Sequence, residues 1–210
     1  MLLLTRLLPF VWCLSFLYDA KPGASSPLAP FSKEWNDSRY LKCNTAASAS
    51  YMNAKEKEVI YILNLLRSNP KLFANTVVQK YPDRSAQNYL RKTREYKSLL
   101  KTLQNMEPLP LLYPDQAGYT SAQCHANWSG KRGYVGHDRN QSCKSKKLFD
   151  GECCDYGHNE ALEVVVSLLI DERVPSLMHR KICLGLYNKI GVSIQPHKTY
   201  RYNAVLDFLY

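Results

Sequence analysis

The chain ends with the stretch Ile190-Gly-Val-Ser-Ile-Gln-Pro-His-Lys-Thr-Tyr-Arg-Tyr-Asn-Ala-Val-Leu-Asp-Phe208. Apolar residues alternate from Ile190 to Ile194, which is the pattern of a strand with one buried face. We expect a turn over residues 196–199 and a second strand running back over residues 202–208. The end of the chain is therefore predicted to form a β-hairpin.

The sequence before the hairpin has the periodicity of helices. Asn53 and Glu56 have the spacing of a capping box, and apolar residues then recur at helical intervals from Val59 to Leu66. The pair Asn69-Pro70 predicts that a helix restarts there, because proline is tolerated at the first helical position. Three further helices are predicted: residues 86–106, residues 115–129 with Asp115 as the cap, and residues 159–170.

The first residues have the composition of a secretory signal. Arg6 precedes an uncharged run over residues 7–18, and this run is too short to span a bilayer as a helix. We expect a signal peptide over residues 1–24, a Pro/Ser/Ala-rich linker over residues 25–50 and one domain over residues 51–210. An uncleaved membrane anchor is the alternative for the first segment. The expected location is secreted, extracellular or periplasmic.

The cysteine count agrees with export. Cys13 lies in the signal-like segment, and its removal leaves an even set: Cys43, Cys124, Cys143, Cys153, Cys154 and Cys183. An even set in an exported chain predicts disulfides, and we expect the neighbours Cys153 and Cys154 to pair with different partners. The alternative is a thiolate zinc cluster, but the chain has no repeated C-x-x-C spacing.

The chain is basic, with 28 Lys and Arg against 18 Asp and Glu. These residues are scattered, apart from a dense group over residues 144–147, and no nucleic-acid-binding motif accompanies them. We therefore predict no nucleic-acid partner and a solvated basic surface. Contact with an anionic cell surface is the alternative that the charge leaves open.

Several motifs occur together in one order. They are Glu58-Val-Ile-Tyr-Ile-Leu-Asn-Leu-Leu-Arg-Ser-Asn-Pro-Lys-Leu-Phe73, Cys124-His-Ala126, Gly133-Tyr-Val-Gly-His137, Leu169-Ile-Asp-Glu-Arg-Val-Pro-Ser-Leu-Met-His-Arg-Lys-Ile182 and Val205-Leu-Asp-Phe208. In this order they resemble the CAP superfamily (cysteine-rich secretory proteins, antigen five and pathogenesis-related group one), especially bacterial members of the Bacteroidetes type. The resemblance covers residue 51 to the end. It implies an α/β fold, a three-layer α-β-α sandwich with a small, mainly antiparallel sheet.

The resemblance also implies a cluster in one cleft. His137 matches the family's first histidine, Glu152 the glutamate of its Gly-Glu-Asn motif and His179 its second histidine. Asp171 is preferred to Glu172 as the fourth, acidic member. Cys153 departs from the family's Asn and points to a family-specific disulfide, and Met178 replaces the family's Gly before His179.

This residue set has the chemistry of a weak divalent-cation site. Imidazole nitrogens and a carboxylate oxygen are suitable zinc ligands, so His137, His179 and Glu152 are the predicted metal ligands. The alternative is a hydrogen-bonded polar network that only shapes the cleft. His125 is predicted to be either an extra ligand or a satisfied helix histidine, and His158 and His197 are predicted to lie on the surface.

Two classes of function remain open. We favour a non-catalytic extracellular binding module that takes a small ligand, lipid or glycan, as the resemblance implies. The alternative is an extracellular hydrolase in which His137 or His179 acts as the base. The chain has neither a Gly-x-Ser-x-Gly elbow nor a His-Glu-x-x-His pair, which argues against common hydrolase classes and leaves any catalytic residues unassigned.

Overall fold

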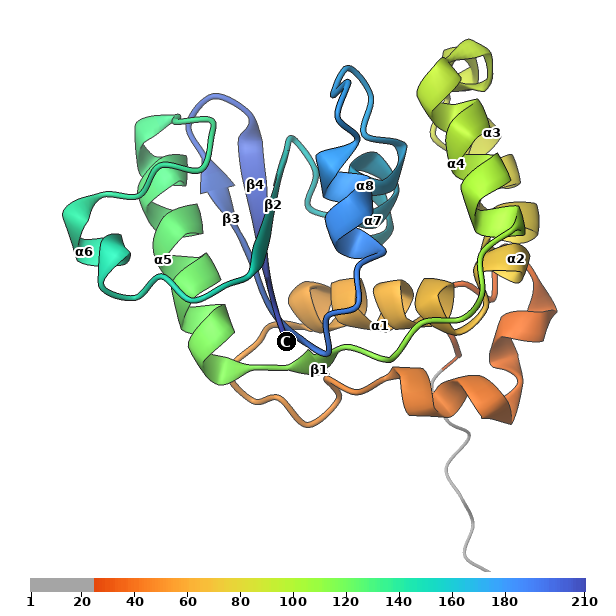
Figure 1. Cartoon of the computed structure of the whole chain (residues 1–210), viewed down its shortest axis with the longest axis horizontal. Coiled ribbons are helices and arrows are strands. Elements are labelled where there is room, and N and C mark those ends of the chain that lie inside the picture. Colours follow the sequence, from red (N-terminus) through yellow and green to blue (C-terminus); the bar gives the residue numbers. More distant parts are fainter. Residues whose placement is uncertain (1–24) are drawn as a thin grey trace, which may run out of the picture.

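A four-stranded sheet lies at the centre of the computed structural model, which describes residues 25–210 (Figure 1). The strand order is β1-β3-β4-β2. β4 (Arg201–Leu209) pairs antiparallel with both β3 (Lys189–His197) and β2 (Gly151–Tyr156), and the short β1 (Tyr113–Pro114) pairs parallel with β3. The predicted terminal hairpin is confirmed, and the fold is mixed α/β with a mainly antiparallel sheet. The signal peptide predicted over residues 1–24 lies outside the described residues.

The first helix begins where its capping residues predict. In α1 (Ala54–Ser68), Asn53 Oδ1 accepts a hydrogen bond from Glu56 N at 3.0 Å, and Glu56 Oε2 accepts one from Asn53 N at 2.9 Å. Helical structure restarts at α2 (Pro70–Phe73), continues through a π-helical turn, η3 (Ala74–Val78), and ends in α3 (Gln79–Arg84). Both the capping box and the restart at the Asn-Pro pair are confirmed.

The helix predicted over residues 86–106 is divided in two. A 3₁₀ helix, η4 (Asn88–Lys92), is followed by α4 (Arg94–Gln104), and the side chain of Thr93 between them accepts a hydrogen bond from Tyr96 N at 3.3 Å. A hydroxyl that caps a helix start satisfies a free amide, so the chain begins a new helix at Thr93.

The later helices follow their predicted positions with small shifts. α5 (Gln116–Arg132) is capped by Asp115, as predicted, and runs past residue 129 to Gly133, whose φ of 69° suits glycine. A short α6 (Gln141–Lys144) comes before β2, and α7 (Ala161–Ile170) and α8 (Met178–Cys183) come between β2 and the hairpin.

Helices cover both faces of the sheet. Successive side chains of a strand point to opposite faces, and on β2 Cys154 packs against Ala122 and Ala126 of α5, whereas Cys153 belongs to the main core with α1 and α7. α5 contacts β3 and β4, while α1 contacts β3 and both α7 and α8 contact β2. Figure 1 shows α5 on one side of the strands and α7 and α8 on the other.

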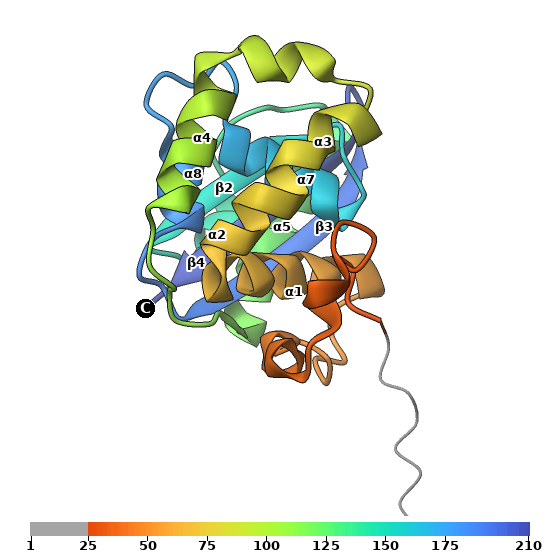
Figure 2. The same cartoon turned by 90° about the vertical axis from the view of Figure 1, so that its right-hand side faces the viewer.

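The segment predicted to be a linker packs into the core instead. Residues 25–50 contain two 3₁₀ helices, η1 (Lys33–Asn36) and η2 (Ser38–Cys43), and Figure 2 shows this segment beside α1. Leu28, Trp35 and Cys43 are completely buried, and Trp35 Nε1 donates a hydrogen bond to Thr76 Oγ1 at 3.1 Å. The small and proline-rich residues flank a few large apolar side chains. The burial of those side chains holds the segment against the rest of the domain.

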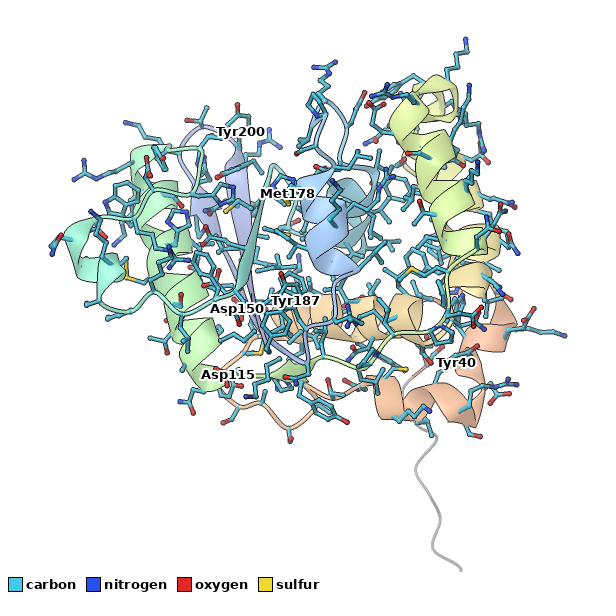
Figure 3. The ribbon with its side chains drawn as sticks, in the orientation of Figure 1. Tyr40, Asp115, Asp150, Met178, Tyr187 and Tyr200 are labelled. Atoms are coloured by element: carbon cyan, nitrogen blue, oxygen red, sulfur yellow. A yellow bond between two sulfur atoms is a disulfide. The ribbon has the colours of Figure 1, made fainter. Side chains whose placement is uncertain are left out.

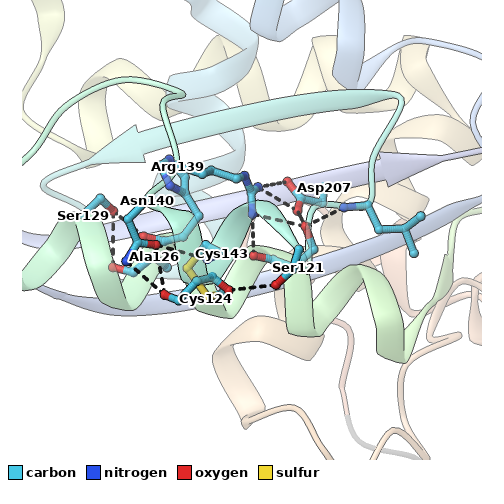
Figure 4. The surroundings of a disulfide bond; sticks show 12 residues. Ser121, Cys124, Ala126, Ser129, Arg139, Asn140, Cys143 and Asp207 are labelled. Carbon is cyan, nitrogen blue, oxygen red and sulfur yellow. Dashed lines mark hydrogen bonds and ion pairs between the residues drawn. A yellow bond between two sulfur atoms is a disulfide. The ribbon is translucent and has the colours of Figure 1, made fainter.

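The cysteines form fewer bridges than predicted. Within residues 25–210 there is one disulfide, Cys124–Cys143, which joins α5 to α6 (Figure 4). The other described cysteines, Cys43, Cys153, Cys154 and Cys183, are free and buried. The expectation that all six pair is therefore wrong for this structure: the thiols of Cys153 and Cys183 meet but are not bonded, and Cys154 is directed to the opposite face of the sheet. Among the same residues, no helix is both long and apolar enough to cross a membrane.

Candidate functional site

A cavity of about 470 Å³ lies beside β2, between the loop after α5 and the start of α8. Segments far apart in the sequence line it, and its titratable lining residues are Tyr81, Tyr89, His137, Cys154, Asp155, Tyr156, His158, Asp171, Glu172 and His179. Both histidines of the predicted cluster are in this set. A concave site with several converging titratable groups is the usual setting for ligand binding.

His137 is held by the glutamate that the sequence paired with it. Its Nδ1 lies 2.8 Å from Glu152 Oε1, and since a carboxylate only accepts, the ring nitrogen donates. The His137 side chain is 56% exposed and that of Glu152 only 2%. The hydrogen bond that the ring donates to Glu152 raises the pKa of His137 above its ordinary value.

His179 is held in the same way by a second carboxylate. Its Nδ1 lies 2.7 Å from Oδ1 of Asp171, whose Oδ2 also accepts from the backbone amide of His179 at 3.0 Å. Asp171 adopts a left-handed backbone, with φ 56°, just after α7, and this turn brings its side chain to α8. Glu172 instead accepts from Tyr89 Oη at 3.0 Å, so Asp171 is the acidic residue that contacts the second histidine.

The two imidazoles converge although they belong to different segments. Their ring centroids are 6.3 Å apart and both side chains line the cavity. Each Nδ1 is occupied by a carboxylate, so Nε2 is the nitrogen that each ring has available for another partner. The structure therefore brings together His137, Glu152, Asp171 and His179 in two histidine–carboxylate pairs.

Arg139 is a member of this site that sequence reasoning missed. Its Nη2 donates to Glu152 Oε2. The same atom donates to Asp207 Oδ2 at 3.0 Å, and Nη1 donates to Ser121 O at 2.7 Å (Figure 4). All three ionisable side chains are at most 2% exposed. Asp207 lies in the quoted Val205–Phe208 motif, but no local signal connects it to an arginine in a distant loop.

These contacts set the ionisation of the buried acids. Burial raises the pKa of Glu152, but the hydrogen bond from His137 and the charge of Arg139 outweigh it, so the net pKa is lowered. Burial raises the pKa of Asp207 well above its ordinary value. Glu152 is thus the carboxylate that carries charge against Arg139 and His137.

The remaining histidines differ from expectation. His197 was predicted on the surface, but it is 3% exposed and its ring contacts the backbone of Tyr134 and Tyr200. His158 was also predicted on the surface, but it lines the cavity and its Nδ1 lies 3.0 Å from Asp155 Oδ2. The burial of His197 depends on Tyr134, 63 residues away, whereas His158 pairs with Asp155 of the adjacent strand β2.

His125 and Met178 are the last two positions singled out from the sequence. His125 is completely buried in α5, and its Nε2 lies 2.9 Å from Gly136 O. Met178, labelled in Figure 3, precedes His179, is 49% exposed and is not one of the residues that line the cavity. The larger residue at that position therefore leaves the cavity open.

Comparison with protein-family models, curated proteins and solved structures finds no match to this chain. The resemblance to the CAP superfamily therefore rests on the ordered sequence motifs alone.

Proposed function

We propose that this chain is an exported CAP-type domain, a three-layer α-β-α sandwich that acts as a non-catalytic binding module. Its cleft would hold a divalent cation such as Zn²⁺ between His137 and His179 and present it to a small ligand, lipid or glycan. The observation that carries this proposal is the convergence of the two imidazoles on one cavity, each with Nδ1 bound to a buried carboxylate.

The two carboxylates have the geometry of orienting residues. A histidine that binds a metal through one nitrogen usually donates its other N–H to a carboxylate, which fixes the ring and increases its basicity. Glu152 and Asp171 supply such partners to His137 and His179. The Nε2 atoms are then the cation ligands, and Glu152, predicted as a direct ligand, supports His137 in this site.

A bound cation would supply a Lewis-acidic position with open coordination for water or a ligand oxygen. The cavity volume of about 470 Å³ is within the range of small-molecule sites. The wall is part polar and part apolar, and Tyr81, Tyr156 and Leu168 contribute to it. This mixture suits a ligand with both a polar head and apolar carbon atoms.

The hydrolase alternative has weaker support in this geometry. Cys154 Sγ lies 3.8 Å from His137 Nδ1, but that nitrogen already donates to Glu152. Burial raises the pKa of the Cys154 thiol well above its ordinary value, which is the opposite of activation for a nucleophile. Ser176, close to His179 in sequence, is exposed and does not line the cavity.

Calorimetry with Zn²⁺ tests the proposal. We expect binding at about pH 7.5 that weakens strongly at about pH 5.5, because protons compete for imidazoles with an ordinary pKa of about 6.5. His179→Ala should abolish this binding. His158→Ala is the matched control, because His158 lines the same cavity but pairs with Asp155 outside the proposed ligand set. Full binding by His179→Ala would overturn the cation site.

A further inference from the structure

We propose that His125, Glu152 and Cys154 form a second, buried site for one zinc-class divalent cation, beneath the cleft. One ligand atom from each of these residues lies within 4.8 Å of those of the other two. The site combines nitrogen, oxygen and sulfur donors, whereas the cleft site of the proposed function has no sulfur. It goes beyond that function and does not require a cation between His137 and His179.

The unsatisfied nitrogen of His125 is the first observation in support. Its Nε2 faces the carbonyl of Gly136 at 2.9 Å, and a carbonyl only accepts, so Nε2 carries the proton. Nδ1 then has a free lone pair, and it is buried without a hydrogen-bond partner among residues 25–210. A backbone carbonyl on the other ring nitrogen is a common support for a metal-bound histidine.

The burial of His125 also favours the ligand form of the ring. Desolvation lowers its pKa, so the imidazole is neutral at physiological pH. The lone pair on Nδ1 of this neutral, buried ring needs a hydrogen-bond donor or a cation. A buried polar atom without a partner lowers the stability of the fold by about 1–3 kcal/mol.

Cys154 and Glu152 supply the other two donors from adjacent positions on β2. Cys154 lines the cavity and packs on the α5 side of the sheet, where His125 lies. The Glu152 oxygens accept from His137 and Arg139, and a carboxylate has about four lone-pair positions, so two remain for a cation. Of the two carboxyl groups against the Arg139 guanidinium, Glu152 is the one that carries charge and can bind a cation.

Binding at this site would exchange a proton for the metal. The Cys154 thiol releases its proton to solvent through the cleft, and its sulfur then donates an electron pair to the cation as a thiolate. A tetrahedral site of this kind has ligand atoms roughly 3.3–3.8 Å apart, so the three donors need to move together by about 1 Å or less. The bound cation would tie α5 to β2 and, through Gly136, to the loop that carries His137.

Cobalt substitution tests the site because only a thiolate ligand produces a sulfur-to-cobalt charge-transfer band in the near ultraviolet. The metal-free full-length protein is titrated with Co²⁺ alone, without reductant and without oxygen. We expect the band to grow to one equivalent and to be lost in Cys154→Ser. Cys153→Ser is the matched control and should retain the band, because Cys153 is the adjacent cysteine directed to the opposite face of the sheet.

Two further measurements keep the result decisive. His179→Ala should lose the cleft cation but retain the charge-transfer band, so failure of the cleft site and failure of the buried site are distinguishable. X-ray absorption of the zinc-loaded wild-type protein should show one sulfur ligand at about 2.3 Å, and this result needs no variant to fold. Absence of both the band and the sulfur ligand in folded wild-type protein would overturn the proposal.

Discussion

Glu152 connects His137 in the cleft to the buried side chain of Arg139. Its two oxygens accept from the ring of His137 and from the guanidinium of Arg139, which also reaches Asp207. All of these contacts except the exposed edge of His137 are buried. Changes at single residues around Glu152 should therefore affect both stability and the ionisation of the cleft.

Removal of the Arg139 charge should be strongly destabilising. Arg139→Gln leaves Glu152 and Asp207 buried without their cation, and a broken buried ion pair typically costs about 3–5 kcal/mol. Urea unfolding of the variant measures this loss. Arg132→Gln is the control, since Arg132 is exposed at the end of α5 and should change stability by less than about 0.5 kcal/mol. Equal stability of the two variants would contradict the buried bridge.

The pKa of His137 should be raised in the folded protein. The hydrogen bond to Glu152 favours the charged ring, so stability from this pair is fully present below the ordinary histidine pKa of 6.5 and is lost as pH rises through the raised value. The pKa of Glu152 is lowered, so its contribution is present above the ordinary value of 4.5 and is lost as pH falls. The hydrogen bond between His137 and Glu152 therefore stabilises the fold through both groups between pH 4.5 and pH 6.5.

NMR titration of the His137 ring checks this ionisation. We expect a midpoint above that of an unfolded peptide, and a return toward the ordinary value in Glu152→Gln, which removes the negative charge. A midpoint in wild-type protein at or below the peptide value would show that desolvation outweighs the hydrogen bond, contrary to the geometry.

At the scale of secondary-structure elements, the start of α1 depends on its capping box. Asn53→Ala should destabilise the protein by about 1 kcal/mol, because Glu56 N loses its acceptor at the helix end. Thermal or urea unfolding measures the change. Glu58→Ala, on the exposed side of the same helix, should have an effect within about 0.5 kcal/mol. A neutral Asn53→Ala would mean that water replaces the cap at no cost.

The contact between α5 and β3 requires glycine. A Cβ added at Gly191 would lie 2.1 Å from the backbone carbon of Gly118 and 2.1 Å from Tyr119 N. Since backbone atoms cannot move aside as a flexible side chain can, Gly191→Ala should separate the helix from the strand and cost at least about 2 kcal/mol. Gly157→Ala tests the contrast, because an added Cβ there meets no atom within 4 Å and only the positive φ opposes it. Similar costs for both variants would contradict the close approach.

At the scale of the whole molecule, the four free cysteines among residues 25–210 are protected by the core. Cys43, Cys153, Cys154 and Cys183 are at most 6% exposed, so a thiol reagent should label them slowly in native protein and fully after unfolding. Mass spectrometry should assign the protected linkage to Cys124 and Cys143 alone. Rapid labelling in native protein, or no thiols after unfolding, would contradict this arrangement.

Reduction of the Cys124–Cys143 disulfide should reduce the stability of the whole fold. Cys124 and Cys143 are 19 residues apart, and a loop of this size predicts a loss of roughly 3 kcal/mol. Unfolding of Cys124→Ser/Cys143→Ser, compared with wild-type protein, measures the difference. The loop closed by this bridge includes His137 and Arg139, so the double variant should also weaken cation binding in the cleft.

The sequence by itself was sufficient where a few neighbouring residues decide the structure. The caps at Asn53 and Asp115, the helix restart at Pro70 and the alternation in the terminal hairpin depend on interactions within a turn or a strand, and each prediction is confirmed. The ordered motifs also selected His137, Glu152 and His179, which the structure brings to one cavity region.

Only the tertiary structure decided which distant surfaces meet. Burial of Trp35, the bridge from Arg139 to Asp207 and the burial of His197 all depend on partners at least 41 residues away, to which local periodicity is insensitive. The even count of cysteines was likewise no guide to their bonds, because Cys153 and Cys183 lie together as free thiols while Cys154 faces the other side of the sheet. Side chains on one strand, such as Cys153 and Cys154, are neighbours in sequence but belong to opposite faces of the sheet.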